Sequence, residues 1–413
     1  MANLRQLRNF IFNLSLGAAA AALVITFLIV VGTQTAQAQT FNVIHNFTGG
    51  GDGALPLSGL TADSAGNFYG TTYSGGIGGG ANGYGTVFEL AHKGSGWILT
   101  PLHNFAGGDD GSGPESKAVF GPGGSLYSTT TVAYQCNGHC TVFELTPPAS
   151  ACKSAICLWT ETVLHRFMGG SDGDQPGYAD LIFDQAGNMY GSTWFGGPGD
   201  QGTVYELMLI NGSWTESVLF AFSGLDGYIP NGMTLDNVGN LYSSTYYTGT
   251  YGKGLVFELT PSESGWTQTI LHEFGAPGDG GEYPASGVIF DQSGNLYGAS
   301  SSNIFEMTLS NGNWIYTSLH TFTGTGPYST IIMDAAGNLY GTAFTDGAYG
   351  YGSVFKMTYS GGSWTYTDLH DFTGGSDGGT IYSCLYLDAK GNLYGTASVG
   401  GAYGYGVVYE ITP

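Results

Sequence analysis

Aspartates beside glycines recur in short segments of this sequence, and together these residue types can bind calcium. Carboxylate and main-chain oxygens are the ligands that Ca²⁺ prefers. No single segment holds as many ligands as an EF-hand, and Asp and Gly are also common turn formers. Calcium binding and turn formation are therefore both open interpretations, and the sequence indicates no other cofactor. The calcium candidates are Asp109, Asp110, Asp172 and Asp174.

A recurring histidine could act as a general base. Phe220 replaces it once, and because a phenylalanine cannot transfer protons, this position favours packing over catalysis. A tryptophan precedes each histidine by six residues, and in an extended strand that even spacing places both side chains on one face. We identify no GxSxG nucleophile elbow, no HExxH motif and no isolated set of Ser, His and Asp, so we predict no catalytic residue and favour a protein that is not an enzyme. The histidines are His103, His165, His272, His320 and His370.

Five cysteines interrupt the regularity of the chain. Because a predicted strand, 141–145, separates Cys136 and Cys140 from Cys152 and Cys157, we expect two local disulfides, Cys136–Cys140 and Cys152–Cys157, in an oxidising compartment. Cys384 would then be a buried free thiol. A zinc site in CNGHC is the alternative, but only three ligands are local there.

Aromatic residues in Gly- and Ser-rich stretches form the largest set of candidate binding residues. Amphipathic rings in such loops suit stacking on sugar rings or flat apolar ligands, and their hydroxyls suit polar contacts. The alternative is that they pack on their neighbours and hold the loops in place. The candidates are Tyr84, Trp194, Tyr247, Tyr251, Tyr349, Tyr351, Tyr403 and Tyr405.

These residues belong to a repeat that the chain contains seven times, marked by motifs such as GNFYG and GNLYG. Each repeat has four short apolar or alternating segments, which we name a, b, c and d; in the first repeat they are 58–63, 67–73, 86–91 and 97–105. A four-stranded unit of about fifty residues matches one blade of a β-propeller. We therefore predict an all-β, seven-bladed propeller over 41–413.

The two ends of the repeat region predict how the ring closes. The region starts with a lone d-like segment, 41–47, and ends with a c-like segment, so the N-terminal strand should complete the last blade. In such a ring the d–a and b–c loops lie on one face. The aspartates above fall in d–a loops and the aromatics in b–c loops, so we expect any binding function on this face.

GNLYGTT, GTVFELT and a tryptophan strand ending in LHxF resemble the tandem repeat of the choice-of-anchor GloVer-containing proteins. The resemblance covers essentially all of 41–413. It implies export and a repeat fold, and the family has no established activity to carry over. The hairpin DxxGN is also similar to those of NHL and streptogramin-lyase-like propellers, a weaker match that concerns blade geometry.

The first 38 residues differ from the repeats. Two arginines, an apolar run over 10–31 and the small-residue pattern at 36–38 predict a secretory signal peptide, or an uncleaved N-terminal anchor that would be the only membrane contact. We expect an extracellular, cell-surface or periplasmic location. The net charge of −22 disfavours nucleic acid as a partner, because phosphate capture needs clustered Lys and Arg.

Together these observations predict an exported, non-catalytic propeller that is a binding or structural module. A carbohydrate or another neutral polymer is the expected ligand of the d–a and b–c loop face. One alternative is a polysaccharide-acting lyase or hydrolase with a site near the central channel. The other is a scaffold that binds a protein at the same face.

Overall fold

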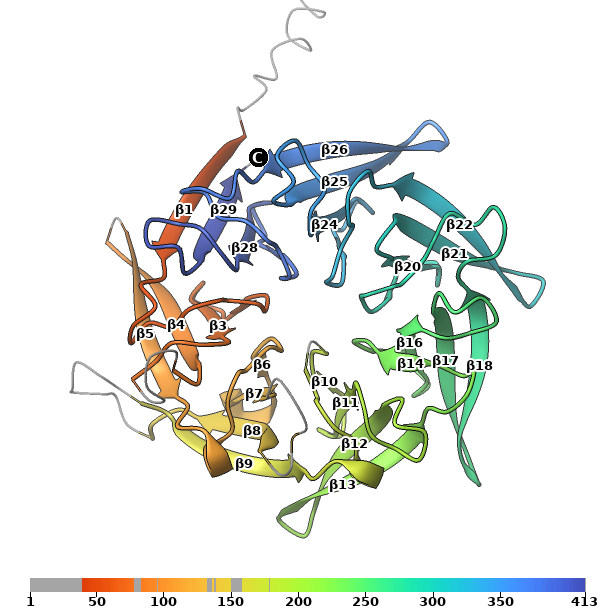
Figure 1. The fold of residues 1–413 in the computed structure, drawn as a ribbon, viewed down its shortest axis with the longest axis horizontal. Helices are drawn as coiled ribbons and strands as arrows, with labels where there is room; N and C mark the ends of the chain where they lie inside the picture. The colour runs from red at the N-terminus through yellow and green to blue at the C-terminus, as the bar shows by residue number, and fades with distance from the viewer. Residues whose placement is uncertain are drawn as a thin grey trace, which may run out of the picture. The chain divides into compact units, whose positions relative to one another are not determined.

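The computed structural model describes residues 39–77, 83–94, 96–131, 136, 139–149, 158–177 and 179–412. These residues form seven antiparallel sheets arranged in a ring, so the predicted seven-bladed propeller is confirmed (Figure 1). The predicted signal segment, 1–38, lies outside the described residues. Within the described part of the chain, no helix is long and apolar enough to cross a membrane.

Each blade contains the four strands a to d, from the channel outward. The a strands are β2 (Thr61–Ala62), β6 (Val119–Phe120), β10 (Ile182–Phe183), β15 (Thr234–Leu235), β19 (Ile289–Phe290), β23 (Ile332–Met333) and β27 (Tyr386–Leu387). The b strands are β3 (Phe68–Thr72), β7 (Leu126–Thr129), β11 (Met189–Thr193), β16 (Leu241–Tyr247), β20 (Leu296–Ala299), β24 (Leu339–Ala343) and β28 (Leu393–Ala397).

The two outer positions hold longer strands. The c strands are β4 (Thr86–Lys93), β8 (Cys140–Thr146), β12 (Thr203–Ile210), β17 (Leu255–Ser262), β21 (Asn303–Ser310), β25 (Ser353–Ser360) and β29 (Val407–Thr412). The d strands are β5 (Gly96–Asn104), β9 (Thr160–Phe167), β13 (Ser213–Ala221), β18 (Gly265–Glu273), β22 (Asn313–Thr321), β26 (Ser363–Asp371) and β1 (Thr40–Asn46). An extra strand, β14 (Tyr228–Pro230), and three short 3₁₀ helices, η1 (Gly108–Asp110), η2 (Pro122–Gly124) and η3 (Gly170–Asp172), complete the elements.

The N-terminal strand closes the ring, as predicted. Strand β1 pairs with β29 in the last blade, and the two lie side by side in Figure 1. The amide of Phe47 donates to the carbonyl of Gly406 at 3.0 Å, and the amide of Ala402 donates to Asn46 Oδ1 at 2.8 Å. This pairing gives the c strand of the last blade an outer partner and removes an open edge.

The a–b turns follow the predicted DxxGN design. In the first blade Asp63 Oδ1 accepts the amides of Ala65 and Asn67 at 2.8 and 2.9 Å, and Gly66 supplies a φ of +83°. The carboxylate therefore replaces water as the partner of the turn amides. The second blade has Gly121 in place of the aspartate and keeps the turn length.

The repeated Tyr of the b strand bonds across to the Glu of the c strand. Tyr242 Oη donates to Glu258 at 2.7 Å, and Tyr297 Oη donates to Glu306 at the same distance. The sixth blade is different, because Lys356 replaces the glutamate and its Nζ lies 5.3 Å from the centre of the Tyr340 ring. The recurring acid of the c strand is therefore a structural partner.

The a strands are shorter than the predicted segments, since each is a two-residue strand while the predicted first segment spans 58–63. The residues before them bond instead to hydroxyl groups of the neighbouring blade. Thr71 Oγ1 donates to the carbonyl of Ser116 at 3.2 Å, and Thr396 Oγ1 donates to that of Ser58 at 2.8 Å. These bonds satisfy main-chain carbonyls at the inner edges of the sheets.

The expectation that Trp and His share one face of the d strand is wrong. In the first blade Phe88 pairs with Pro101 and Val87 pairs with His103, so Leu102 is an extra residue that reverses the alternation. Trp314 consequently packs in a cluster with Tyr242 of the preceding blade, while His320 stacks on Tyr366 of the following blade at 3.8 Å. The bulge lets each d strand contact both of its neighbours.

Candidate functional site

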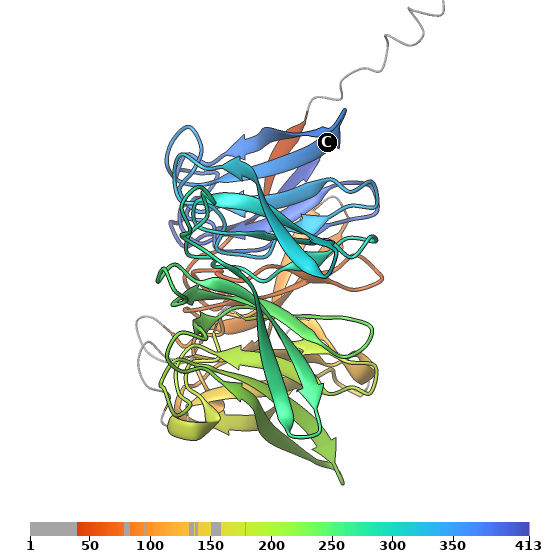
Figure 2. The ribbon, with the colours of Figure 1, turned by 90° about the vertical axis from the view of Figure 1, so that its right-hand side faces the viewer.

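The d–a and b–c loops lie on one face of the ring and bond to each other (Figure 2). Ala54 of a d–a loop pairs with Ser74 of the b–c loop in the same blade. Main-chain bonds also join most b–c loops to the next blade, as where the amide of Thr380 donates to the carbonyl of Tyr351 at 2.8 Å. Thr380 has a φ of +57°, so the loop conformation is fixed at some steric cost.

Three of the predicted aromatics hold these loops. Tyr84, Tyr351 and Tyr405 each accept such a main-chain bond and cover a d–a glycine with their rings. A Cβ atom on Gly49 would lie 2.7 Å from the Tyr405 ring, so this glycine is needed for the ring to approach. The packing interpretation therefore applies to these three side chains, although about half of each remains exposed.

The other predicted aromatics separate into two places. Tyr349 and Tyr403 extend from the loops with 61% of their surface exposed, and Tyr251 lies against Gly275. Tyr247 contacts Tyr246 at 4.6 Å between ring centres, and Trp194 lines a pocket with Tyr246. The structure therefore brings only some of the predicted binding residues together.

Five histidines of the d strands lie within 3.6 Å of an aspartate seven residues later in the d–a loop, and three of them, His45, His103 and His370, are hydrogen-bonded to it. Burial disfavours the charge of Asp110, but the hydrogen bonds from His103 and from the amide of Ala106 outweigh it, so the pKa of Asp110 is lowered. Burial also lowers the pKa of His272 and His370, which favours neutral rings. The pairs are His45–Asp52, His103–Asp110, His165–Asp172, His272–Asp279 and His370–Asp377.

Two of the four calcium candidates belong to these pairs. Asp110 and Asp172 close their loops through His103 and His165 at 3.2 and 3.6 Å. Asp109 is 95% exposed and lies 3.9 Å from Arg166, while the buried Asp174 accepts the amide of Cys136 at 2.9 Å. The turn-forming interpretation accounts for these contacts, and calcium binding stays a prediction.

The predicted disulfide between Cys136 and Cys140 is present. The amide of Gln175 lies 3.1 Å from Cys136 Sγ. In other blades the corresponding amide donates to a main-chain carbonyl of the b–c loop, so the Cys136 sulfur takes the place of that carbonyl. Asp174 completes a cluster with both sulfurs, but two disulfide-bonded sulfurs cannot serve as thiolate ligands for zinc. The second predicted disulfide, Cys152–Cys157, lies outside the described residues.

Four aromatic side chains from four segments meet at the loop-face mouth of the channel. Tyr246 and Tyr328 are parallel at 6.5 Å with their hydroxyl oxygens 3.4 Å apart, and Tyr328 and Tyr382 are 5.9 Å apart. With Trp194 they line an apolar pocket of about 140 Å³. A cavity of that size accepts one six-membered ring. We call Trp194, Tyr246, Tyr328 and Tyr382 the mouth aromatics.

The pocket adjoins a larger cavity of about 460 Å³ inside the channel, with which it shares Ala285, Tyr328 and Tyr382. All seven blades contribute to the wall of this cavity, which has the volume of a small-molecule site. The middle level of its wall is formed by one residue from each blade, the residue four positions before the first residue of the a–b turn. The residues at this level differ from blade to blade: Gly59, Lys117, Asp180, Gly232, Gly287, Thr330 and Cys384.

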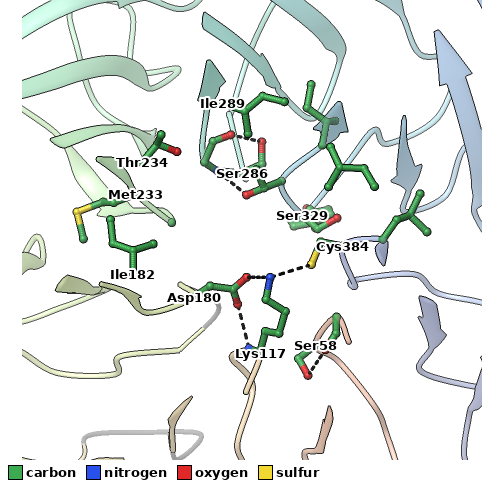
Figure 3. Close-up of a pocket in the computed structure, with 18 of the residues that line it drawn as sticks. Ser58, Lys117, Asp180, Ile182, Met233, Thr234, Ser286, Ile289, Ser329 and Cys384 are labelled. Atoms are coloured by element: carbon green, nitrogen blue, oxygen red, sulfur yellow. Dashed lines mark hydrogen bonds and ion pairs between the residues drawn. The ribbon is translucent and has the colours of Figure 1, made fainter. Parts of the chain in front are cut away.

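Lys117, Asp180 and Cys384 point toward one another across the wall of the cavity (Figure 3). Lys117 Nζ lies 3.3 Å from Asp180 Oδ2 and 4.0 Å from Cys384 Sγ, and the amide of Lys117 donates to Asp180 Oδ1 at 2.9 Å. Burial raises the pKa of the Cys384 thiol. Cys384 and Asp180 raise the pKa of Lys117 against the effect of its burial, so its ammonium persists at neutral pH.

The cavity residues were not among the predicted sites, although the sequence contains a signal for them. Counting four residues back from each a–b turn gives Lys, Asp and Cys where other repeats have Gly or Thr. The predictions followed residues that recur, and these residues do not. Tyr328 and Tyr382 were missed because they lie just before the a strands β23 and β27, outside the b–c loops from which the aromatic candidates were taken.

The model of the Gloeobacter/Verrucomicrobia repeat matches residues 30–232, 155–326 and 232–413. The chain belongs to this family. The assignment confirms the resemblance to GloVer tandem repeats and leaves the activity of this repeat protein open. No functionally curated protein matches its sequence.

Solved structures similar to this Gloeobacter/Verrucomicrobia repeat protein include virginiamycin B lyase from Staphylococcus aureus. That match has 12% identity and a TM-score of 0.55 over 91% of this chain and 99% of the lyase. The extracellular domain described for a hybrid two component system from B. thetaiotaomicron matches with 13% identity and a TM-score of 0.52, over 90% of this chain and 39% of that one. At such identities the likeness concerns the propeller fold alone.

Proposed function

We propose that this repeat protein is an exported, non-catalytic binding module for a carbohydrate or another neutral polymer, which it takes at the mouth of the channel. The supporting observation is the apolar pocket of the mouth aromatics beside a larger cavity whose wall has both polar and apolar side chains. Aromatic faces provide area for the apolar face of a sugar ring, and nearby polar groups orient its hydroxyls.

The rim of the loop face, the outer part that carries Tyr84, Tyr349, Tyr351, Tyr403 and Tyr405, gives weaker support for the same function. Tyr349 and Tyr403 are exposed but lie on separate blades, and Tyr84, Tyr351 and Tyr405 are engaged with loop glycines. A polymer that enters the mouth would pass over this rim. We therefore assign the specific contact to the mouth and only accessory contacts to the rim.

The test is retention of residues 39–413 on a panel of soluble and insoluble polysaccharides, with released sugars recorded in the same samples. We expect retention without products, and weaker retention of a Trp194→Ala variant. Failure of every polysaccharide to retain the protein would contradict the proposal and would favour a protein partner at this face.

A second candidate is a lyase or hydrolase with its site in the channel. The observation that favours it is the middle level of the cavity, where an ammonium, a carboxylate and a thiol occur once each around the ring. A catalytic group works in a site whose neighbours differ, and this level meets that condition. Release of sugar products by the unmodified protein, and its loss in Asp180→Asn, would establish the enzyme.

A further inference from the structure

The ion pair of Lys117 and Asp180 has hydrogen-bonding capacity beyond its own contacts. An ammonium has three donors, of which one faces Asp180 and one faces the weakly accepting Cys384 sulfur. The Asp180 carboxylate has about four acceptor positions, of which Lys117 takes two through its amide and its ammonium. One donor and further acceptors therefore lie side by side in the cavity wall.

The charges around the cavity disfavour a strongly charged ligand. Of the described residues that line it, the charged ones are Glu115, Lys117 and Asp180, and the pairing of Lys117 with Asp180 cancels its positive charge locally. A carboxylate or phosphate ligand would meet two anions for one cation. An uncharged ligand with an adjacent donor and acceptor fits the pair better, and a vicinal diol has this arrangement.

The shape of the site determines which part of a polymer can reach the pair. Inner-strand residues of all seven blades surround the cavity, so a chain can enter it from the mouth with an end first. Below the middle level the wall is mostly apolar, at Val119, Ile182, Ile289 and Ile332. The hydroxyl of Thr234 at this depth already donates to the carbonyl of Val288, so a ligand finds few polar partners there. The polar contacts of a ligand therefore belong at the level of Lys117 and Asp180.

We propose that the channel binds the terminal residue of an uncharged sugar chain, with adjacent hydroxyls paired to Lys117 and Asp180 and the preceding ring against the mouth aromatics. This inference rests on the proposed function and specifies its ligand. One hydroxyl accepts from the Lys117 ammonium and its neighbour donates to the Asp180 carboxylate. Recognition of a chain end predicts one protein per chain, whatever the chain length.

The first test is calorimetric titration with cellohexaose, xylohexaose, maltohexaose and laminarihexaose. For the hexaose that binds, Asp180→Asn keeps the shape of the side chain and should weaken binding by about tenfold or more, as expected for a lost charge-assisted hydrogen bond. Lys117→Met should do the same, and Lys390→Met, an exposed lysine in an a–b turn, is the matched control. Equal affinities of Asp180→Asn and the unmodified protein would overturn the inference.

A second test needs no variant, because the Cys384 thiol lies beside the pair. The rate at which iodoacetamide modifies Cys384, read by peptide mapping, should fall severalfold when the binding hexaose is saturating; an unchanged rate would place the ligand elsewhere. Retention on a polysaccharide without binding of any hexaose would reject the chain-end inference and leave the proposed function standing. If no polysaccharide retains the protein, the proposed function itself fails.

Discussion

The outer rim of the loop face and the middle level of the channel differ in how their polar and aromatic residues are distributed among the blades. At the rim, tyrosines, histidines and aspartates recur from blade to blade and bond within the loops. In the channel, one position changes from Gly to Lys, Asp, Thr or Cys around the ring.

The comparison separates residues that build the repeat from residues that could serve a ligand. Every blade must close the same loops and satisfy the same main-chain groups, so a residue that recurs is explained by the blade itself. The blade has no such need for Lys117 or Asp180, because Gly232 and Gly287 occupy the same level. Departures from the repeat therefore identify the candidate site.

The largest expected effect concerns a rim glycine. Gly202 has a φ of +98°, and a Cβ there would lie 2.3 Å from the Thr193 carbonyl oxygen. Gly202→Ala should lower the free energy of unfolding by about 3 kcal/mol or more, because backbone must move. Gly239 has a φ of +96° with open space around it, so Gly239→Ala is the matched control and should cost about 1 kcal/mol. Urea denaturation measures both, and equal losses would contradict the packing account.

A pH effect in the outer strands should be next in size, at Glu161 of β9 and Glu216 of β13. Burial, with the charges of Asp110 and Asp172, raises the pKa of Glu161 and Glu216 to about 7. A carboxyl whose folded pKa is raised contributes stability below its unfolded pKa of about 4.3, and that contribution is lost as the pH rises toward 7.

The double variant Glu161→Gln and Glu216→Gln should therefore be more stable than the unmodified protein above pH 7, by about 1 kcal/mol for each residue after allowance for solvent screening. The difference should vanish toward pH 4.5. Urea midpoints at several pH values measure it, and a difference independent of pH would show that burial of these acids has been misjudged.

The contrast between mouth and rim predicts that the loss of one mouth ring weakens polysaccharide binding about tenfold. Trp194→Ala should weaken polysaccharide retention by that factor, since a stacking aromatic contributes about 0.5–1.5 kcal/mol in addition to the area it buries. Tyr349→Ala, which removes an exposed rim ring, should leave retention within twofold of the unmodified protein. Greater loss from the rim variant would reverse the assignment of the specific contact.

The smallest effect tests whether the repeat is itself a stabilising pattern. Lys356→Glu would give the sixth blade the Tyr and Glu pair found in other blades. We expect it to stabilise the protein by at most about 0.5 kcal/mol, because the Tyr340 hydroxyl already donates to Asp334 at 3.0 Å and would share its one proton with the new glutamate. A loss of stability in thermal unfolding would show that the lysine and Tyr340 are adapted to each other.

The sequence was sufficient for the ring, its closure and the a–b turns, because these depend on segment order and on local turn chemistry. It also predicted the Cys136–Cys140 disulfide from short spacing. The face of His103 was predicted wrongly, since the extra residue at Leu102 is visible only when the partner strand is paired with it. Even spacing along one strand does not reveal a bulge.

The candidate site was predicted only in part. Trp194 and Tyr247 were identified from loop composition, and they lie at or beside the mouth. Lys117 and Asp180 are ordinary in their local sequence, and they come together only because neighbouring a strands meet at the channel. Their position in the repeat carries the information, which appears when the seven segments are aligned at the a–b turn.

The most direct test of the central claim compares two double variants on the polysaccharide that retains the protein. One removes mouth rings, Trp194→Ala with Tyr382→Ala, and the other removes rim rings, Tyr349→Ala with Tyr403→Ala. With folding verified by circular dichroism, we predict that the mouth variant loses retention and the rim variant keeps it. Retention that survives loss of the mouth rings and disappears with the rim rings would contradict the account.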